Sequence, residues 1–286
     1  MQQNVARRPR FHRVEDFPAT RLTERDKAII SVVSRFRFLT TRQILSLVPG
    51  SRQNISRRLQ RLYHTGFLDR PRAQLPLRFA GELAEIVYSQ SRRTVSGKKY
   101  RPISSLFLRH ALSVSDTLIS VELACRQQRL AFSAEREIVN AVSEHEGAKH
   151  LRWRVTVKSG EVNEKVGIIP DAAFAIDRRN LAGNLQRFYF FLEADRGTMP
   201  IWRKTLRLSS IYRKAFAYSQ TRRSGILKDR FGIAGFQVLF ITPSKDRLER
   251  MNDACSEVLQ GRHASLFLFS TPEELRRNPL TILGMI

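Results

Sequence analysis

Three short helical patterns follow one another within residues 22–66, and this arrangement restricts the fold more than any other feature of the chain. A hydroxyl residue that can cap a helix, Thr23, Thr40 or Ser51, precedes each pattern. Apolar residues recur within each pattern at the spacing of a helix with one buried face. We therefore predict three successive helices, the third beginning at Ser51 and ending near His64.

Two short runs after the third helix, Phe67–Pro71 and Leu77–Phe79, can pair as a hairpin. Three helices followed by a two-stranded wing are typical of the winged form of the helix-turn-helix. We predict such a domain over residues 22–88. A flexible basic arm at 1–21 precedes it, and a polar linker at 89–101 follows it.

The third helix has two different faces when its residues are placed about 100° apart. Ile55, Leu59 and Leu62 fall on one side, which should be buried. Amide and guanidinium groups can form two hydrogen bonds in one plane with a base edge, so the opposite side is suited to DNA. The residues expected on or beside that outward face are Gln53, Asn54, Arg57, Gln60, Arg61 and His64. Arg52 and Arg58 lie off this face at positions suited to phosphates, and the cap Ser51 completes the predicted DNA-binding set. The alternative is a solvated polar face on an ordinary helix.

The charge balance favours a polyanionic partner. The chain has 50 Lys and Arg against 26 Asp and Glu, a net charge of +24. Residues 1–100 carry 21 basic and 7 acidic side chains, so the remaining residues are basic as well. Double-stranded DNA is the first candidate. No membrane partner is expected, because no amphipathic helix with a large apolar face and no run of about 18 apolar residues occurs.

Residues 102–286 alternate between helical and strand-like patterns. Helices are predicted at 103–128, 201–220 and 245–260. Strands are predicted at 132–139, 151–157, 165–176, 188–194, 236–242 and 266–269. The run Phe188–Ala194 is strongly apolar and should be central. This order predicts an α/β sandwich with a mixed sheet, and an α+β chain overall.

Three carboxylates stand out in the predicted strands. Asp171 follows Pro170 inside the strand predicted at 165–176, while Glu193 and Asp195 end the apolar strand and share one face because they are two residues apart. If the strands are neighbours, the three side chains converge into a set of oxygen ligands that favours Mg²⁺ or Mn²⁺. Ordinary ion pairs with nearby arginines are the alternative.

Other kinds of site have little support in the sequence. It contains no GxxxxGK[ST] phosphate loop, no GxGxxG dinucleotide motif and no paired histidines of the two-histidine relaxase type. The two cysteines, Cys125 and Cys255, have neither zinc-site nor disulfide-framework spacing, so we predict buried free thiols in a reducing compartment.

The chain resembles the replication-relaxation family of bacterial plasmids and integrated mobile elements. The resemblance lies in the order and spacing of several motifs between about residues 22 and 242. These motifs are LTERDKAIISVVSRFRFLTTRQI, RLYHTGFLDR, RHALSVSD, PDAAFAI, FFLEADRGT and KTLRLSSIYRKAFAY.

The resemblance implies a winged helix joined to a restriction-endonuclease-like domain, similar to the PD-(D/E)xK nucleases and to MobC-type relaxases. It makes Asp171 the aspartate of the PD motif and Glu193 the second acid, and it offers Glu122 as an extra acid. Asp195 replaces the usual lysine two residues after the glutamate. Lys204 is the candidate to take the place of that lysine among the catalytic residues.

Three functions follow as hypotheses. The first is a DNA-binding replication or mobilisation protein of a mobile element in the bacterial cytoplasm, which nicks DNA with Mg²⁺ or Mn²⁺ if its site is active and needs no cofactor otherwise. The second is a non-catalytic DNA-binding regulator that uses a degenerate nuclease fold for homodimerisation or DNA contact. The third is an adaptor that recruits other replication or conjugation proteins.

Overall fold

A computed structural model of the chain describes residues 10–15, 17–18, 21–91, 102–142, 150–159, 162–180, 182–203, 205–260 and 264–284. Its contacts divide the chain into two compact units, Met1–Ile119 and Ser120–Ile286. The division falls within the long helix α5 (Ser105–Gln127), which confirms the helix predicted at 103–128. Most of the predicted linker lies outside the described residues.

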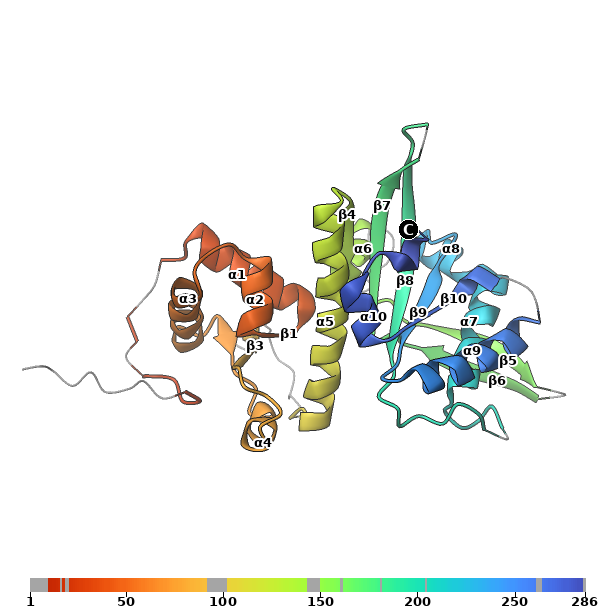
Figure 1. Cartoon of the computed structure of the whole chain (residues 1–286), viewed down its shortest axis with the longest axis horizontal. Helices are drawn as coiled ribbons and strands as arrows, with labels where there is room; N and C mark the ends of the chain where they lie inside the picture. Colours follow the sequence, from red (N-terminus) through yellow and green to blue (C-terminus); the bar gives the residue numbers. More distant parts are fainter. Residues whose placement is uncertain are drawn as a thin grey trace, which may run out of the picture. The chain divides into compact units, whose positions relative to one another are not determined.

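The first unit combines short helices with a three-stranded antiparallel sheet. Its helices before α5 are α1 (Glu24–Phe36), α2 (Thr41–Leu47), α3 (Arg52–His64) and α4 (Gln74–Phe79). Its strands are β1 (Phe38–Thr40), β2 (Leu68–Asp69) and β3 (Val87–Gln90). The strand order is β1-β3-β2, so β3 lies between the other two (Figure 1).

The helix starts of the first unit are those that the sequence predicts. Thr23 and Thr40 form capping boxes at the starts of α1 and α2, and the Ser51 hydroxyl accepts a hydrogen bond from the backbone N–H of Asn54 at the start of α3. Gly66 follows α3 with a φ of 85°, a left-handed conformation that favours glycine. The three predicted helices are therefore confirmed.

The predicted hairpin of the first unit is wrong in its second strand. Residues 77–79 belong to α4, and β2 pairs instead with β3. Pro76 is compatible with this helix because it lies in the first turn, where its missing N–H removes no intrahelical hydrogen bond. The β2–β3 pair thus forms through a longer connection that contains α4.

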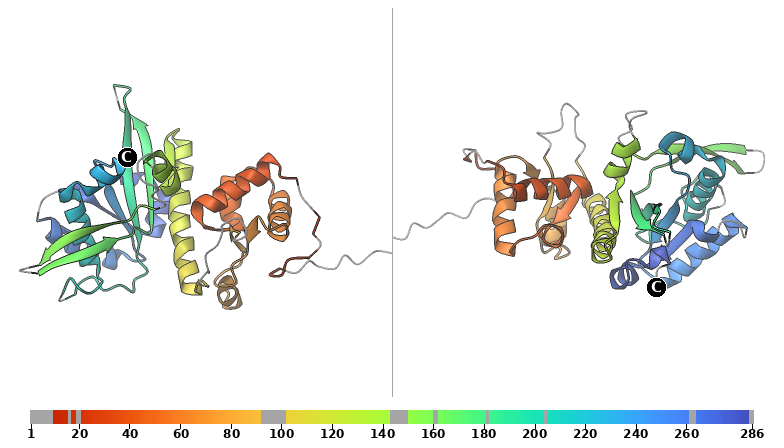
Figure 2. Two further views of the ribbon diagram at one scale, coloured as in Figure 1. Left: turned by 180° about the vertical axis from the view of Figure 1, so that it is seen from behind. Right: turned by 90° about the horizontal axis from the view of Figure 1, so that it is seen from above.

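The second unit is built on a mixed five-stranded sheet. Its strands are β4 (Ala131–Ala134), β7 (Ala172–Arg179), β8 (Leu185–Ala194), β9 (Gln237–Ile241) and β10 (Phe267–Ser270). The strand order is β10-β9-β8-β7-β4, with parallel pairing from β10 to β8 and antiparallel pairing from β8 to β4. The predicted mixed sheet and the central place of the apolar strand are confirmed. Since β9 joins β8 only from Phe190 onward and β4 joins β7 only as far as Asp177, the end of β7 and the start of β8 project beyond the other strands (Figures 1 and 2).

A separate hairpin and several helices complete the second unit. The hairpin consists of β5 (Trp153–Ser159) and β6 (Val162–Ile168), which pair antiparallel. The helices are α6 (Glu135–Val142), α7 (Ile211–Ser224), α8 (Ile226–Phe231), α9 (Lys245–Leu259) and α10 (Pro272–Arg277), with short 3-10 turns at Ala264–Leu266 and Thr281–Leu283. One buried core joins β5, α7 and α9 to the face of β8 that carries Phe191.

Three predicted elements of the second unit are wrong. The strand expected at 165–176 is two strands, because β6 ends at Ile168 and β7 begins at Ala172. The strand expected at 132–139 ends at Ala134, where the chain turns into α6. The helix expected at 201–220 begins only at Ile211, so the segment before it is a loop. Cys125 and Cys255 are buried free thiols, as predicted.

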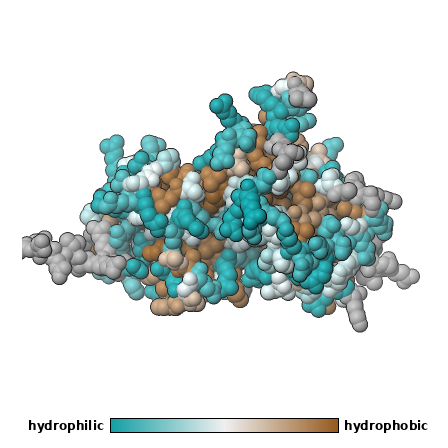
Figure 3. Space-filling view, in the orientation of Figure 1, coloured by the Kyte–Doolittle hydropathy of each residue, from teal (hydrophilic) through white to brown (hydrophobic). Residues whose placement is uncertain are grey.

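The surface is rich in hydrophilic side chains. Figure 3 shows them across much of one face, with apolar residues visible between them. In the part of the chain that the structure describes, no helix is both long enough and apolar enough to cross a membrane.

Candidate functional site

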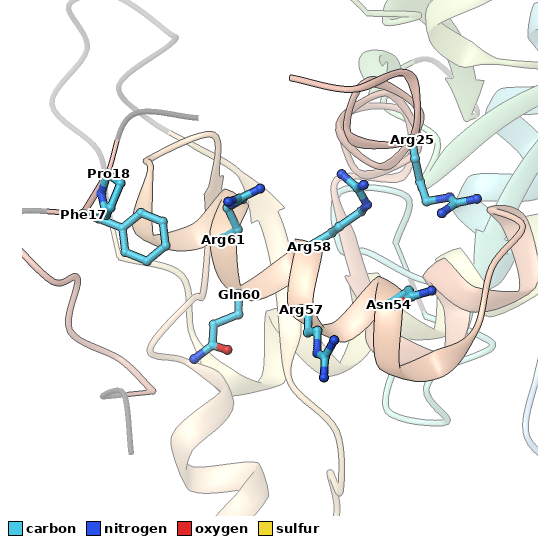
Figure 4. Close-up of a pocket in the computed structure, with 8 residues that line it drawn as sticks. All are labelled: Phe17, Pro18, Arg25, Asn54, Arg57, Arg58, Gln60 and Arg61. Carbon is cyan, nitrogen blue, oxygen red and sulfur yellow. The ribbon is translucent and has the colours of Figure 1, made fainter. Parts of the chain in front are cut away.

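The first candidate site is a concave surface along α3, which we call the α3 surface. It encloses a cavity of about 520 Å³. Its lining residues are Phe17, Pro18, Arg25, Asn54, Arg57, Arg58, Gln60 and Arg61 (Figure 4). Four arginines and two amide side chains therefore meet at one hollow of the first unit.

The orientation of α3 explains this composition. Ile55, Leu59 and Leu62 are fully buried against the rest of the unit. The opposite side of the helix remains in solvent, where Gln53, Asn54, Arg57 and Arg61 are exposed and Gln60 is half-buried. Arg52 is also exposed, but it pairs with Glu85 at 3.0 Å. The predicted outward orientation is confirmed for Gln53, Asn54, Arg57, Gln60 and Arg61.

Arg58 has a structural partner that the sequence did not predict. Its Nη1 donates hydrogen bonds to the two carboxylate oxygens of Asp26, at 3.0 and 2.8 Å, and to the Thr23 hydroxyl at 2.8 Å. The Asp26 side chain is completely buried. Burial would raise the pKa of Asp26, but the hydrogen bonds from Thr23 and Arg58 outweigh it and hold that pKa below its usual value. Arg58 thus borders the α3 surface and also ties α3 to α1.

The prediction that His64 shares the outward face is wrong, because His64 is only 4% exposed. The ring of Phe17 stacks on it with centroids 5.2 Å apart, and its Nδ1 accepts a hydrogen bond from the backbone N–H of Val14 at 3.2 Å. Arg13 donates nearby to the backbone oxygens of Tyr63 and Leu68. Part of the predicted arm therefore covers the end of α3.

The second candidate site lies where β8 ends, and we call it the Glu193 cluster: Asp171, Glu193, Lys214 and Tyr218. Glu193 is 3% exposed. Its Oε1 accepts a hydrogen bond from the Tyr218 hydroxyl at 2.6 Å, and its Oε2 pairs with the Lys214 ammonium. Lys214 and Tyr218 are four residues apart on α7 and hence on one face of that helix. Glu193, Lys214 and Tyr218 border a cavity of about 220 Å³.

Asp171 stands beside Glu193 and directly precedes the neighbouring strand β7. Its Oδ2 accepts a hydrogen bond from the backbone N–H of Ala194 at 2.9 Å, and its own N–H donates to the Leu192 oxygen. Burial raises the pKa of Glu193, and the Asp171 charge adds to this effect against the opposing ammonium of Lys214. Burial alone would lower the pKa of Lys214, but the two carboxylates outweigh it and raise that pKa.

The prediction that three carboxylates converge is wrong, because Asp195 has other partners. Its side chain pairs with Arg247 and accepts a hydrogen bond from the Thr242 hydroxyl at 3.1 Å. Glu122, the proposed extra acid, pairs with Arg126. Within the described residues, no three His, Cys, Asp or Glu side chains are grouped to hold a metal ion. Lys204 lies outside those residues.

Several members of these two sites were not predicted from the sequence. Lys214 and Tyr218 left a signal, because they are four residues apart in a segment predicted to be helical. Arg25 and Phe17 left none, since only the tertiary packing of α1 and the arm brings them to the α3 surface.

A comparison with known protein families identifies the family of this chain. The model of the replication-relaxation family matches residues 30–235, which include α3 and the whole Glu193 cluster. Comparisons with curated proteins and with solved structures found no match. Since the matched residues make up more than half of the 286-residue sequence, the chain belongs to the replication-relaxation family.

Proposed function

We propose that this chain binds double-stranded DNA through the α3 surface as part of the replication or mobilisation of a mobile element. Family membership indicates a function related to replication or mobilisation. The observation that carries the DNA proposal is the cavity that four arginines and two amides border on one side of α3. That chemistry matches a polyanion that also presents base edges.

The topology of the first unit supports a winged helix-turn-helix. In that motif the second helix of the pair enters the major groove and a two-stranded wing lies beside it. Here α2 and α3 are consecutive helices, and the β2–β3 pair follows them in the sheet β1-β3-β2. The α3 helix is then the recognition helix, and the connection with α4 belongs to the wing.

Different residues of the α3 surface have different tasks in this proposal. Arg57, Asn54 and Gln60 reach base edges, because their planar groups can form paired hydrogen bonds. Arg25 and Arg61 contact phosphates and set the position of the helix. Arg58 remains paired with Asp26 and adds positive potential.

Binding to a duplex selected from a randomised pool by the full-length chain tests this proposal, with a scrambled duplex as reference. Arg57→Ala should weaken binding to the selected duplex by about 1–3 kcal/mol and should reduce the preference over the scrambled one. Arg57→Lys is the matched variant: it keeps the charge but loses the planar fork, so it should lose preference while keeping most of the non-specific affinity. An unchanged preference in both variants would remove α3 as the reading helix.

The Glu193 cluster favours a second candidate function, metal-dependent nicking of DNA. Magnesium is commonly bound by one or two carboxylates together with substrate phosphates and water. Asp171 and Glu193 fit this donor set, and Mg²⁺ or Mn²⁺ bound there would activate water and stabilise charge on a phosphodiester. Lys214 lies beside both carboxylates and can hold a phosphate oxygen or orient the water, which makes it a better candidate than Lys204 for the missing lysine.

Nicking of a supercoiled plasmid that carries the selected duplex separates a nuclease from a non-catalytic binder. With Mg²⁺ or Mn²⁺, the nuclease should form open circles, and Asp171→Asn should abolish them. Asp177→Asn is a matched control, since Asp177 lies on β7, the strand that Asp171 directly precedes, and pairs with Arg187. Binding without nicking would support the regulator that uses this fold only for DNA contact or dimerisation.

A further inference from the structure

An aromatic pair is presented to solvent on the loop between β8 and α7. Trp202 is 44% exposed, although tryptophan side chains are on average largely buried in folded proteins. Its indole stacks on the Tyr212 ring with centroids 4.6 Å apart and planes 29° apart. The only other tryptophan of the chain, Trp153, is 3% exposed. Trp202 is thus braced from one side by a residue of α7.

The exposed indole borders a cavity of about 380 Å³, within the range of small-ligand sites. The lining residues are Pro200, Ile201, Trp202, Arg247, Arg250 and Asp253. Trp202 is the aromatic residue of this lining, and the Tyr212 ring stacked on it lies outside the lining.

Residues of α9 also line the cavity. Arg247 and Arg250 are three residues apart and lie on one side of that helix. Arg247 pairs with Asp195 and donates to the Met199 oxygen, which fixes the loop against α9. Arg250 is exposed and has no hydrogen bond or ion pair within the described residues. Arg203, next to Trp202, is exposed as well.

We propose that this cavity binds an unpaired base of single-stranded DNA by stacking it on Trp202, with Arg250 and Arg203 on the flanking phosphates. Aromatic side chains beside a positively charged groove are the usual means of holding a single strand, because every base offers a π face. A duplex hides those faces within its stack. The lining carboxylate of Asp253 can accept a hydrogen bond from an exocyclic amino group of the base.

This site goes beyond the proposed function, which concerns duplex DNA and the other unit. The site is connected to the Glu193 cluster through Arg247. Arg247 lines the cavity and pairs with Asp195, which is two residues from Glu193 in the chain. A protein that opens or processes DNA at an origin produces unpaired strands. The Trp202 cavity supplies a place to hold one of them near the end of β8.

Intrinsic fluorescence of the full-length chain offers a direct test, because Trp202 is its one exposed tryptophan. A mixed-sequence single-stranded DNA oligonucleotide should quench this emission, while the buried Trp153 should remain unquenched. The same sequence as a duplex should quench less. Arg57→Ala should leave the quenching unchanged, so failure of the α3 proposal and failure of this one can be told apart.

Variants measured by anisotropy of a labelled single strand complete the test. Trp202→Leu removes the π face and should weaken binding by about 5- to 150-fold, whereas Trp202→Phe should restore most of it. Leu208→Ala is the matched control, because Leu208 is a 52% exposed apolar residue of the same loop. If Trp202→Leu unfolds, Arg250→Gln takes its place: the slope of log affinity against log salt should fall by about 0.7.

Three results would overturn the proposal. They are unquenched emission, equal binding of Trp202→Leu and wild type, and tighter binding of the same sequence as single-stranded RNA. Either of the first two results would indicate that the exposed indole contacts a protein partner instead of DNA. The third would indicate that the cavity binds RNA.

Discussion

Replacement of Arg58 should destabilise the first unit, even though Arg58 borders the surface proposed to bind DNA. Its guanidinium provides the positive charge that faces the buried carboxylate of Asp26. Arg58→Met keeps the apolar part of the side chain and removes that charge. Within the part of the chain that the structure describes, the carboxylate then keeps two donors, the Thr23 backbone N–H and hydroxyl, which lie 2.9 and 2.7 Å away.

The size of the effect follows from these contacts. Removing one partner of a fully buried ion pair costs about 3–5 kcal/mol. Arg58 is 27% exposed, and Asp26 keeps its two hydrogen bonds from Thr23, so we expect about 2–3 kcal/mol. At about 4 °C per kcal/mol for a unit of this size, the unfolding temperature of the first unit should fall by about 8–12 °C.

Scanning calorimetry of the full-length chain measures this change, with Arg57→Met as the matched control. Arg57 is one residue earlier on the same helix, is exposed, and makes no hydrogen bond or ion pair within the described residues. Its replacement should change stability by less than about 0.5 kcal/mol. Equal unfolding temperatures for the two variants would refute the structural role of Arg58. The role predicted from the sequence, a contact with a DNA phosphate, would then remain.

Three further predictions concern buried titratable groups. Because the pKa of Asp26 is lower in the folded chain than its ordinary 3.8, its contribution to stability should be present above that pH and be lost as the pH falls below it; Asp26→Asn should remove this dependence in acid unfolding. Lys214→Met leaves the Glu193 carboxylate without its cation and should cost about 2 kcal/mol near neutral pH, less than a fully buried pair because Lys214 is 36% exposed. This loss should shrink toward pH 4, where Glu193 becomes protonated in the unfolded chain too, and denaturant titrations at several pH values measure it. Burial raises the pKa of Cys125 to about 11 and that of Cys255 further, so iodoacetamide at about pH 8 should modify both thiols only after unfolding, as mass spectrometry would detect.

Local signals explain what the sequence predicted well. The caps at Thr23, Thr40 and Ser51 depend on neighbours three residues away, so the helix starts could be placed correctly. The apolar run that forms β8 has few places in a folded chain other than the centre of a sheet. The outward face of α3 followed from helical periodicity alone.

Short elements were harder, because few residues carry their pattern. The six residues of α4 contain Pro76 and an alternating Leu77-Arg78-Phe79, which also fits a strand. The run that begins at Phe132 continues into α6 without a Gly or Pro that would mark a boundary. The strand and the helix could therefore not be separated from the sequence.

The main errors at the sites come from contacts between distant residues. Arg58 meets Asp26 from 32 positions away, and Lys214 meets Glu193 from 21 positions away. His64 is buried because a segment about 50 residues earlier packs on it. Asp195 points to Arg247, which lies on a helix beyond the next strand of the sheet. Periodicity contains no information about such partners.

The salt dependence of duplex affinity tests the central claim most directly, measured for the full-length chain and for a variant with Arg25, Arg57 and Arg61 all changed to Gln. For the wild type, log affinity should fall linearly with log salt between about 50 and 300 mM. The variant should bind more weakly and with a slope smaller by about 0.9 for each of these arginines that contacts a phosphate. If the variant keeps the wild-type affinity and slope, the α3 surface is not the DNA-binding site.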